Sequence, residues 1–131
     1  MNVWIKKPIK KILKEKPDWC YFPSLTKNSS QDVEKLQFIG IECGVLIKKP
    51  SKYYILNAYD QGFDSILFDL ENFSWTPENI ELIRFVQFLN MGVHFVGSRH
   101  LLHKKSNLLQ IRKFKILKKY VFERKDILNI K

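Results

Sequence analysis

The stretch Gly62–Gly97, GFDSILFDLENFSWTPENIELIRFVQFLNMGVHFVG, decides the fold because it carries every signal of one strand–helix–strand unit. Two apolar runs, Ser65–Phe68 and Val93–Val96, are typical of strands buried on both faces of a parallel sheet. Between them, Thr76 is a good N-cap for a helix with apolar residues at helical spacing. Gly92 is expected to supply the left-handed C-cap of that helix. Parallel strands need such a crossover, so the unit predicts a parallel sheet.

The rest of the chain adds similar units on both sides of this one. Further strands are predicted at residues 19–22 and 45–47, and further helices at residues 31–43, 51–61 and 107–128. The fold class is therefore α/β, with the element order βαβαβαβα and a mostly parallel, four-stranded sheet. Residues 1–17 are expected to form a basic N-terminal arm, and residues 18–131 one domain that ends in a basic helix.

The net charge of +10 is unevenly distributed along the 131 residues. Residues 1–17 hold six lysines and one glutamate, and residues 101–131 hold ten basic and two acidic groups. The body between them holds seven basic and ten acidic groups. Basic ends of this kind predict a salt-sensitive attraction to the phosphates of nucleic acid.

The two cysteines, Cys20 and Cys43, lack metal-ligand spacing and are expected to be small buried apolar residues. Such cysteines fit a reducing cytoplasm. No apolar run approaches the ~18 residues of a membrane span, and no secretory signal is apparent. The sequence therefore predicts a cytoplasmic protein that is associated with the nucleoid if it binds DNA, with no cofactor and no bound metal.

Four segments of the chain, in this order, match the catalytic domain of a known family of DNA-processing proteins. The segments are Tyr21–Thr26 with Gln31 in the next helix, Asp64–Phe68 running into Leu70–Trp75, Met91–Val96, and Phe122–Ile127. In these segments the chain resembles the serine recombinases, the resolvase and DNA-invertase family, over about residues 18–128. The resemblance implies a resolvase-like three-layer fold and a role in DNA recombination. It also implies that a dimer helix begins at Glu123 and Arg124.

The departures from the family pattern fall on the residues that carry its chemistry. Family members attack a DNA phosphodiester with a serine, and arginines stabilise the charge that develops on the phosphate. Here Leu25 stands at the nucleophile position, and Pro23, Asn72 and Trp75 stand at arginine positions. The one remaining arginine, Arg124, cannot replace several charge-assisted hydrogen bonds. The resemblance therefore predicts a catalytically inactive protein that binds DNA or an active recombinase and regulates or supports recombination.

Two other classes of function stay open at this point. An active strand-transferring recombinase or nuclease would need a shifted nucleophile at Ser24, with Arg124 and Asp64 beside it. A protein-interaction module unrelated to DNA would need none of these residues.

Two further groups of residues could serve a metal. His100 and His103 lie three residues apart, and Asp64, Asp69 and Glu71 gather around one strand. The histidines have no carboxylate or cysteine nearby in sequence, which favours solvated or phosphate-facing side chains over a metal site. The carboxylates resemble those of metal-dependent nucleases, but no lysine follows on the next strand.

The expected DNA contacts lie mainly on the last predicted helix, which is apolar on one side and basic on the other. The predicted DNA-binding residues are Lys104, Lys105, Arg112, Lys113, Lys115, Lys118, Lys119 and Arg124. Trp75, at the carboxyl edge of the predicted sheet, is a candidate for stacking on a base.

The far half of that long helix would expose apolar side chains in a monomer. The predicted dimer interface consists of Val121, Phe122, Ile127 and Leu128. Pairing with a second copy, or with an active recombinase, would bury them. A homodimer with a dissociation constant nearer micromolar than nanomolar is the expected result.

Overall fold

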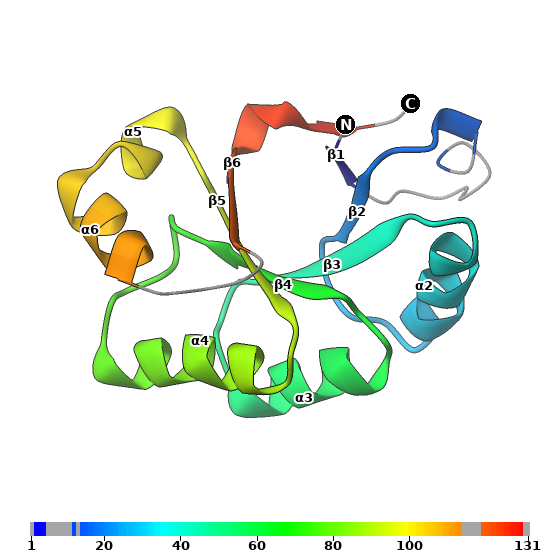
Figure 1. Cartoon of the computed structure of the whole chain (residues 1–131), viewed down its shortest axis with the longest axis horizontal. Coiled ribbons are helices and arrows are strands. Elements are labelled where there is room, and N and C mark those ends of the chain that lie inside the picture. Colours follow the sequence, from blue (N-terminus) through cyan, green and yellow to red (C-terminus); the bar gives the residue numbers. More distant parts are fainter. Residues whose placement is uncertain (1, 5–11, 13, 114–118, 130–131) are drawn as a thin grey trace.

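The computed structural model describes residues 2–4, 12, 14–113 and 119–129. Its strands are β1 (Asn2–Trp4), β2 (Trp19–Phe22), β3 (Glu42–Ile47), β4 (Ser65–Asp69), β5 (Gly92–Gly97), β6 (Lys119–Glu123) and β7 (Ile127–Asn129). Its helices are α2 (Ser29–Phe38), α3 (Lys52–Asp60), α4 (Pro77–Phe88), α5 (Arg99–Leu102), α6 (Lys105–Lys113) and the short 3-10 helix η1 (Arg124–Asp126). The α/β class is confirmed (Figure 1).

The strands form one seven-stranded sheet in the order β6-β5-β4-β3-β2-β1-β7, and every pairing between neighbours is parallel. Five of them, β2 to β6, alternate with helices along the chain. The prediction of four strands was therefore too low. Strand β1 comes from the predicted N-terminal arm, and β6 and β7 come from the predicted last helix.

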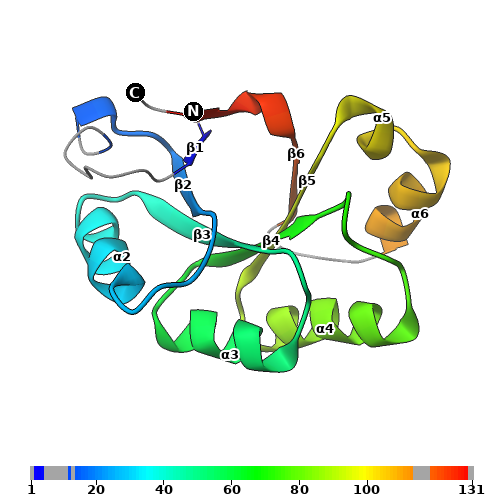
Figure 2. The same cartoon turned by 180° about the vertical axis from the view of Figure 1, so that it is seen from behind.

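The sheet is singly wound, because each of the strands β2 to β6 pairs with the strand that precedes it in the chain. Right-handed crossovers that all step in one direction place their helices on one side of the sheet. Figures 1 and 2 show this arrangement, with α2, α3, α4 and the α5–α6 pair around the outside of the strands. Helices on both faces, as the three-layer prediction required, are not what the described elements form.

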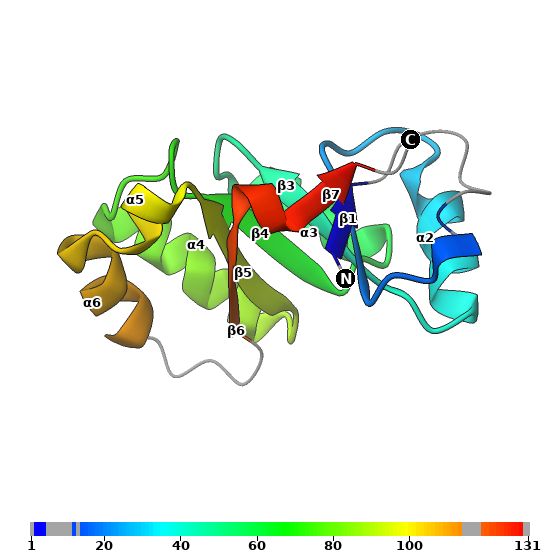
Figure 3. The same cartoon turned by 90° about the horizontal axis from the view of Figure 1, so that it is seen from above.

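The sheet is strongly curved, and the link from β6 to β7 shows why. These two strands lie at opposite ends of the strand order, yet only η1 separates them in sequence. Seven strands laid flat would span ~29 Å, whereas the four steps from Glu123 to Ile127 reach at most ~14 Å. The edges must therefore approach each other. Figure 3 shows β6 continuing through η1 into β7, which lies beside β1.

Side chains alternate between the two faces of the sheet and form two separate cores. On the outer face, residues such as Val45, Ile66 and Phe95 pack against the helices. The inner, concave face holds a smaller cluster that includes Tyr21, Leu46, Leu67, Val96 and Ile127, with Trp4 and Trp19 packed against it.

The central unit is confirmed with one correction at the end of its helix. The Thr76 hydroxyl accepts a hydrogen bond from the Asn79 amide, and Pro77 is the first helical residue. The left-handed residue after the helix is Asn90, with φ 62°, and not Gly92, which begins β5. Asparagine tolerates this conformation better than other residues with a side chain. The next strand therefore starts one residue earlier than predicted.

Of two other predicted helices, one is confirmed and the other is shorter than predicted. Helix α3 is confirmed, since the Ser51 hydroxyl caps it and Gly62, with φ 90°, follows it. Helix α2 ends at Phe38, five residues before its predicted end, because Gly40 adopts φ 87° and the chain turns into β3. The predicted strand 45–47 is correspondingly longer, from Glu42 to Ile47.

The predicted helix over residues 107–128 is wrong. Helix α6 ends at Lys113, and β6, η1 and β7 follow after residues that lie outside the description. Strand β6 pairs with the edge of β5, from Val93 opposite Lys119 to Gly97 opposite Glu123. A free edge of a parallel sheet leaves backbone groups unpaired, and this pairing satisfies them.

Candidate nucleic-acid interface

The candidate interface is a basic hollow at the carboxyl edge of the sheet, directly after β5. It has a volume of about 570 Å³ and is lined by Arg99, His100, His103 and Lys104. All four residues are exposed. Ser98 begins this segment, and its hydroxyl accepts a hydrogen bond from the Leu101 amide, which caps α5. The hollow is therefore held by a capped turn at the end of a buried strand.

A chain of hydrogen bonds and packing fixes the helices beside this hollow. The Trp75 indole Nε1–H donates to Asn107 Oδ1 at 2.8 Å, and Asn107 Nδ2 donates to the Leu101 carbonyl at 2.7 Å. The Trp75 ring also packs against Phe73 and Phe95, with ring centroids 4.8 and 5.9 Å away. Trp75 thus anchors α5 and α6 to the outer core. The structure does not support its prediction as a platform for a base.

Helix α6 extends the basic surface away from the hollow. Lys105, Arg112 and Lys113 are exposed, whereas Ile111 is buried against the outer core. The structure therefore brings four of the predicted DNA-binding residues onto one unit, namely Lys104, Lys105, Arg112 and Lys113. Lys115 and Lys118 lie outside the described residues. Lys119 begins β6 and Arg124 begins η1, and their side chains lie outside the description.

The residues of the shifted catalytic site are not brought together. Ser24 is exposed in the loop after β2, at the carboxyl edge of the sheet. Asp64 precedes β4, at the amino edge, where its Oδ2 accepts hydrogen bonds from the Cys43 amide at 2.7 Å and from Gln37 Nε2 at 3.0 Å. The length of a strand separates the two positions. Asp64 therefore has a structural role in joining α2, β3 and β4.

Asp69 also lies far from Asp64. Asp69 lies at the carboxyl end of β4, opposite Asp64, and is buried. Its carboxylate accepts hydrogen bonds from the Glu71 amide and from Asn72 Nδ2, both at 3.1 Å, so it closes the turn after the strand. Within the described residues, no group of three or more histidine, cysteine or acidic side chains could hold a metal ion.

A polar group on the inner face was not predicted from the sequence. The Tyr21 hydroxyl and His94 Nδ1 share a hydrogen bond of 2.8 Å whose direction depends on the imidazole tautomer. The Trp19 ring lies edge-on to the imidazole at 4.5 Å. Burial lowers the pKa of His94 to about 3, so this imidazole is neutral at physiological pH.

Gly44 makes this arrangement possible. A Cβ atom at this position would lie 2.6 Å from Ser65 Oγ and 2.8 Å from Tyr21 Cδ1. The Tyr21 ring therefore lies over β3 at the position where the strand has no side chain, and its hydroxyl reaches His94. Ser65 Oγ is buried, and no described residue forms a hydrogen bond with it.

The cysteines are buried on neighbouring strands, where Cys20 is the register partner of Cys43. Burial raises the pKa of the Cys20 thiol to about 12 and also raises that of Cys43. Both thiols are therefore protonated and unreactive at neutral pH. This agrees with the prediction that they are small apolar residues.

The residues predicted to form a dimer interface do not share a helix. Val121 and Phe122 belong to β6, and Ile127 and Leu128 belong to β7. Ile127 is buried in the inner core, so it is not available to a partner. The helical dimer contact predicted at Glu123 and Arg124 is instead the junction of β6 with η1.

No family model, curated protein or solved structure matches the chain. In the described part of the chain, no helix is long and apolar enough to cross a membrane.

Proposed function

We propose that this protein is a non-enzymatic nucleic-acid-binding domain that holds phosphates in the hollow formed by Arg99, His100, His103 and Lys104. The observation that carries the proposal is the lining of the hollow, where every described residue has a basic or imidazole side chain. Guanidinium and ammonium groups are the usual ligands of nucleic acid phosphates. Helix α6 adds Lys105, Arg112 and Lys113 along the path that a phosphate backbone would follow from the hollow.

No described carboxylate neutralises the two permanent charges of the hollow. Arg99 and Lys104 form no ion pair with any described carboxylate, whereas Arg84 and Lys125 each pair with a glutamate. Unpaired cations on a fixed scaffold gain most when an external anion binds, because no internal ion pair has to break. The hydrogen bonds from Trp75 through Asn107 to Leu101 support this scaffold.

A role in recombination is a further step that rests on the resemblance to serine recombinases. The order of the matching segments supports it, as does Leu25 at the nucleophile position, which would leave the protein inactive. The single winding of the sheet and strand β6 at the position of the family's dimer helix do not support it. Of the predicted role, DNA contact is the part that the geometry favours, and the partnership with an active recombinase stays a prediction.

A fluorescence-anisotropy titration of a labelled 20-base-pair DNA of mixed sequence would test the proposal at several salt concentrations between ~50 and ~200 mM. The variant Arg99→Gln/Lys104→Gln removes both permanent charges from the hollow. Each lost phosphate contact lowers the slope of log affinity against log salt by about one unit, so we expect a loss of about two. Affinity at the lowest salt concentration should fall on the order of tenfold or more.

The matched control is Lys35→Gln/Arg84→Gln, which removes two exposed charges from α2 and α4. Both variants change the net charge by the same amount, so a general attraction to DNA would weaken equally in both. We expect the control to keep the slope of the unmodified protein. Equal slopes in the two variants, or no binding by the unmodified protein at low salt, would contradict the proposal.

A further inference from the structure

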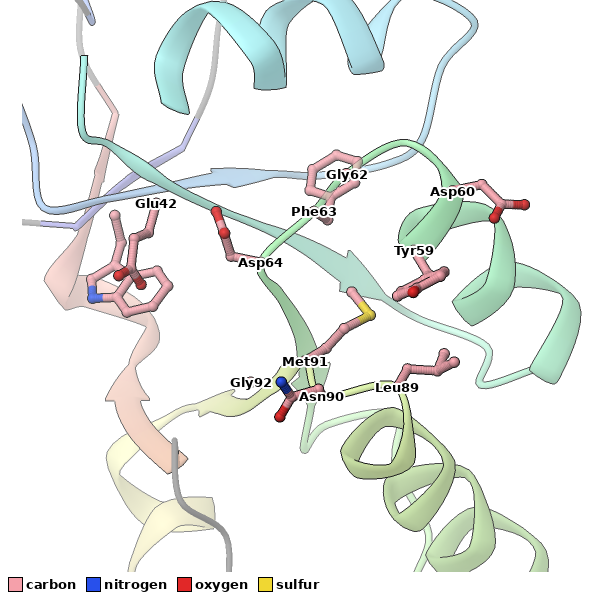
Figure 4. Close-up of a pocket in the computed structure, with 11 residues that line it drawn as sticks. Glu42, Tyr59, Asp60, Gly62, Phe63, Asp64, Leu89, Asn90, Met91 and Gly92 are labelled. Atoms are coloured by element: carbon pink, nitrogen blue, oxygen red, sulfur yellow. The ribbon is translucent and has the colours of Figure 1, made fainter. Parts of the chain in front are cut away.

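A second hollow, of about 510 Å³, lies at the opposite, amino edge of the sheet (Figure 4). Its lining comes from the starts of strands β2 to β5 and from the turns after α3 and α4. The lining residues are Trp19, Glu42, Tyr59, Asp60, Gly62, Phe63, Asp64, Leu89, Asn90, Met91 and Gly92. Among the residues that the structure describes, no basic side chain lines it, in contrast to the hollow at the carboxyl edge.

Large, exposed aromatic side chains lie at or near the ends of the three helices that lead into this edge of the sheet. Phe38 ends α2 with 91% of its surface exposed, and Phe88 ends α4 with 82% exposed. Tyr59, near the end of α3, lines the hollow itself and is 48% exposed. Phe38 follows Gln37, whose amide donates to the Gly62 carbonyl at 2.7 Å, and Phe88 precedes Leu89. Single exposed apolar residues are ordinary, but three exposed aromatic rings at the helix ends along one edge of the sheet indicate an interaction surface.

The charge of this surface selects the kind of partner. Glu42 and Asp60 are exposed and pair with no described cation, while Asp64 is held by Cys43 and Gln37. The exposed aromatic rings suit the guanidinium groups and aliphatic stems of basic side chains. A partner for this surface therefore presents arginine or lysine on a compact, projecting element.

The protein itself carries such an element at the other edge of its sheet. Helices α5 and α6 present Arg99, Lys104, Lys105, Arg112 and Lys113, all of them exposed. The chain has a net charge of +10, yet these two surfaces have opposite charge. The basic surface of one copy is therefore complementary to the acidic surface of a second copy.

We propose that the protein associates with itself head to tail, with the α5–α6 surface of one copy seated on the aromatic, acidic hollow of the next. The two contact surfaces are different and lie at opposite ends of the strands. Such a heterologous contact does not close into a two-fold dimer and instead continues from copy to copy. It uses the same cations as the proposed nucleic-acid contact, so DNA and a second copy compete for them.

Sedimentation equilibrium over a range of protein concentrations, in ~50 and ~500 mM salt, would test this association. At low salt the average mass of the unmodified protein should rise steadily past that of a dimer, and at high salt it should stay near that of the monomer. The variants Glu42→Lys/Asp60→Lys and Arg99→Glu/Lys104→Glu should each stay monomeric at both salt concentrations. An equimolar mixture of the two should associate, because each then meets a surface of opposite charge.

Two further variants separate the specific contact from general effects. Glu34→Lys/Glu78→Lys changes the net charge as much as Glu42→Lys/Asp60→Lys does, but at exposed positions on α2 and α4. This control variant should associate normally. Phe38→Ser/Phe88→Ser leaves the charge unchanged and should raise the dissociation constant at least tenfold. Circular dichroism would show that each variant is folded, and the DNA titration would be a second check for the variants that keep Arg99 and Lys104.

The outcomes for self-association and for DNA binding are distinguishable. Glu42→Lys/Asp60→Lys should bind DNA at least as well as the unmodified protein while failing to self-associate. If it self-associates normally, or if the unmodified protein is monomeric at low salt, the head-to-tail contact is wrong while the proposed DNA contact still stands. Self-association without any DNA binding would overturn only the proposed function.

Discussion

The two faces of the curved sheet bury different kinds of side chain. The outer face meets the helices through aliphatic and aromatic side chains, and its two cysteines remain protonated because burial raises the pKa of both thiols. The inner face buries a histidine, a tyrosine hydroxyl and a serine hydroxyl beside its apolar residues. Buried polar groups depend on their partners and on their protonation state, so the inner face should be the more sensitive to pH and to small changes of shape.

Lowering the pH should have the largest effect on stability, because it protonates His94 on the inner face. Its folded-state pKa of about 3 lies below the value of about 6.5 for an unfolded chain, so the unfolded chain binds the proton more readily. The stabilising contribution is present above pH ~6.5 and is lost as the pH falls through 3, by roughly 5 kcal/mol in all. Urea unfolding at a series of pH values between ~4 and ~8 would measure this loss.

The variant His94→Gln keeps a hydrogen-bonding group but cannot titrate in this range. Its free energy of unfolding should fall less steeply with acid than that of the unmodified protein, by up to ~1.4 kcal/mol per pH unit. His100→Gln, at an exposed position, is the control for the loss of a histidine side chain. Parallel pH profiles for the unmodified protein and His94→Gln would show that His94 does not set the acid limit.

A smaller effect is expected when a methyl group is added to the inner face at Gly44. The new Cβ atom would lie 2.6 Å from Ser65 Oγ and 2.8 Å from the Tyr21 ring, so Gly44→Ala should cost about 1–3 kcal/mol of unfolding free energy. Gly97→Ala is the matched control in a strand, because its Cβ atom would have a looser nearest contact, 3.3 Å from Leu70 Cβ. Thermal and urea unfolding would compare the two.

Shortening the obstructing side chain tests whether the clash is the cause. The double variant Gly44→Ala/Ser65→Gly should recover part of the loss relative to the sum of the two single variants. Strict additivity would mean that Ser65 and residue 44 do not compete for the same space, and that the strain lies with the Tyr21 ring alone.

The parts of the fold that the sequence predicted well carry their own local signals. Helix α4 has both a capping threonine and an N-terminal proline, and Ser51 caps α3 as expected. Strand β6 was missed because Leu117 and Val121 continue the helical spacing of α6. The run Tyr120-Val121-Phe122, rich in β-formers, was the signal that could have identified the strand. Its assignment depends on pairing with β5, which no local pattern contains.

The arrangement of the elements was harder to predict than the elements themselves. Singly and doubly wound sheets share the same alternation of strands and helices, so the choice between them depends on which strands become neighbours. The contact between Tyr21 and His94 joins residues 73 positions apart and exists because the sheet curls. The acidic hollow, by contrast, could have been inferred, since the starts of parallel strands meet at one edge and Glu42 and Asp64 both lie there.

The smallest expected effect concerns one hydroxyl group on each face of the sheet. Tyr21→Phe removes the hydrogen bond to His94 on the inner face. Tyr54→Phe removes the bond that the Tyr54 hydroxyl donates to the Leu46 carbonyl at 3.2 Å, together with the one that it accepts from the Leu25 amide. A single hydrogen bond contributes about 1 kcal/mol to stability, and a buried partner left unsatisfied costs about 1–3 kcal/mol.

Because His94 is fully buried whereas Tyr54 is only half-buried, Tyr21→Phe should lower the free energy of unfolding by more than Tyr54→Phe does, although Tyr54 makes two bonds. Urea unfolding at pH 7.5, where His94 is neutral in both states, would measure the difference without a contribution from titration. A larger loss for Tyr54→Phe would reverse the ranking and make the carboxyl end of β3, where the Tyr54 hydroxyl joins two backbone segments, the more sensitive polar contact.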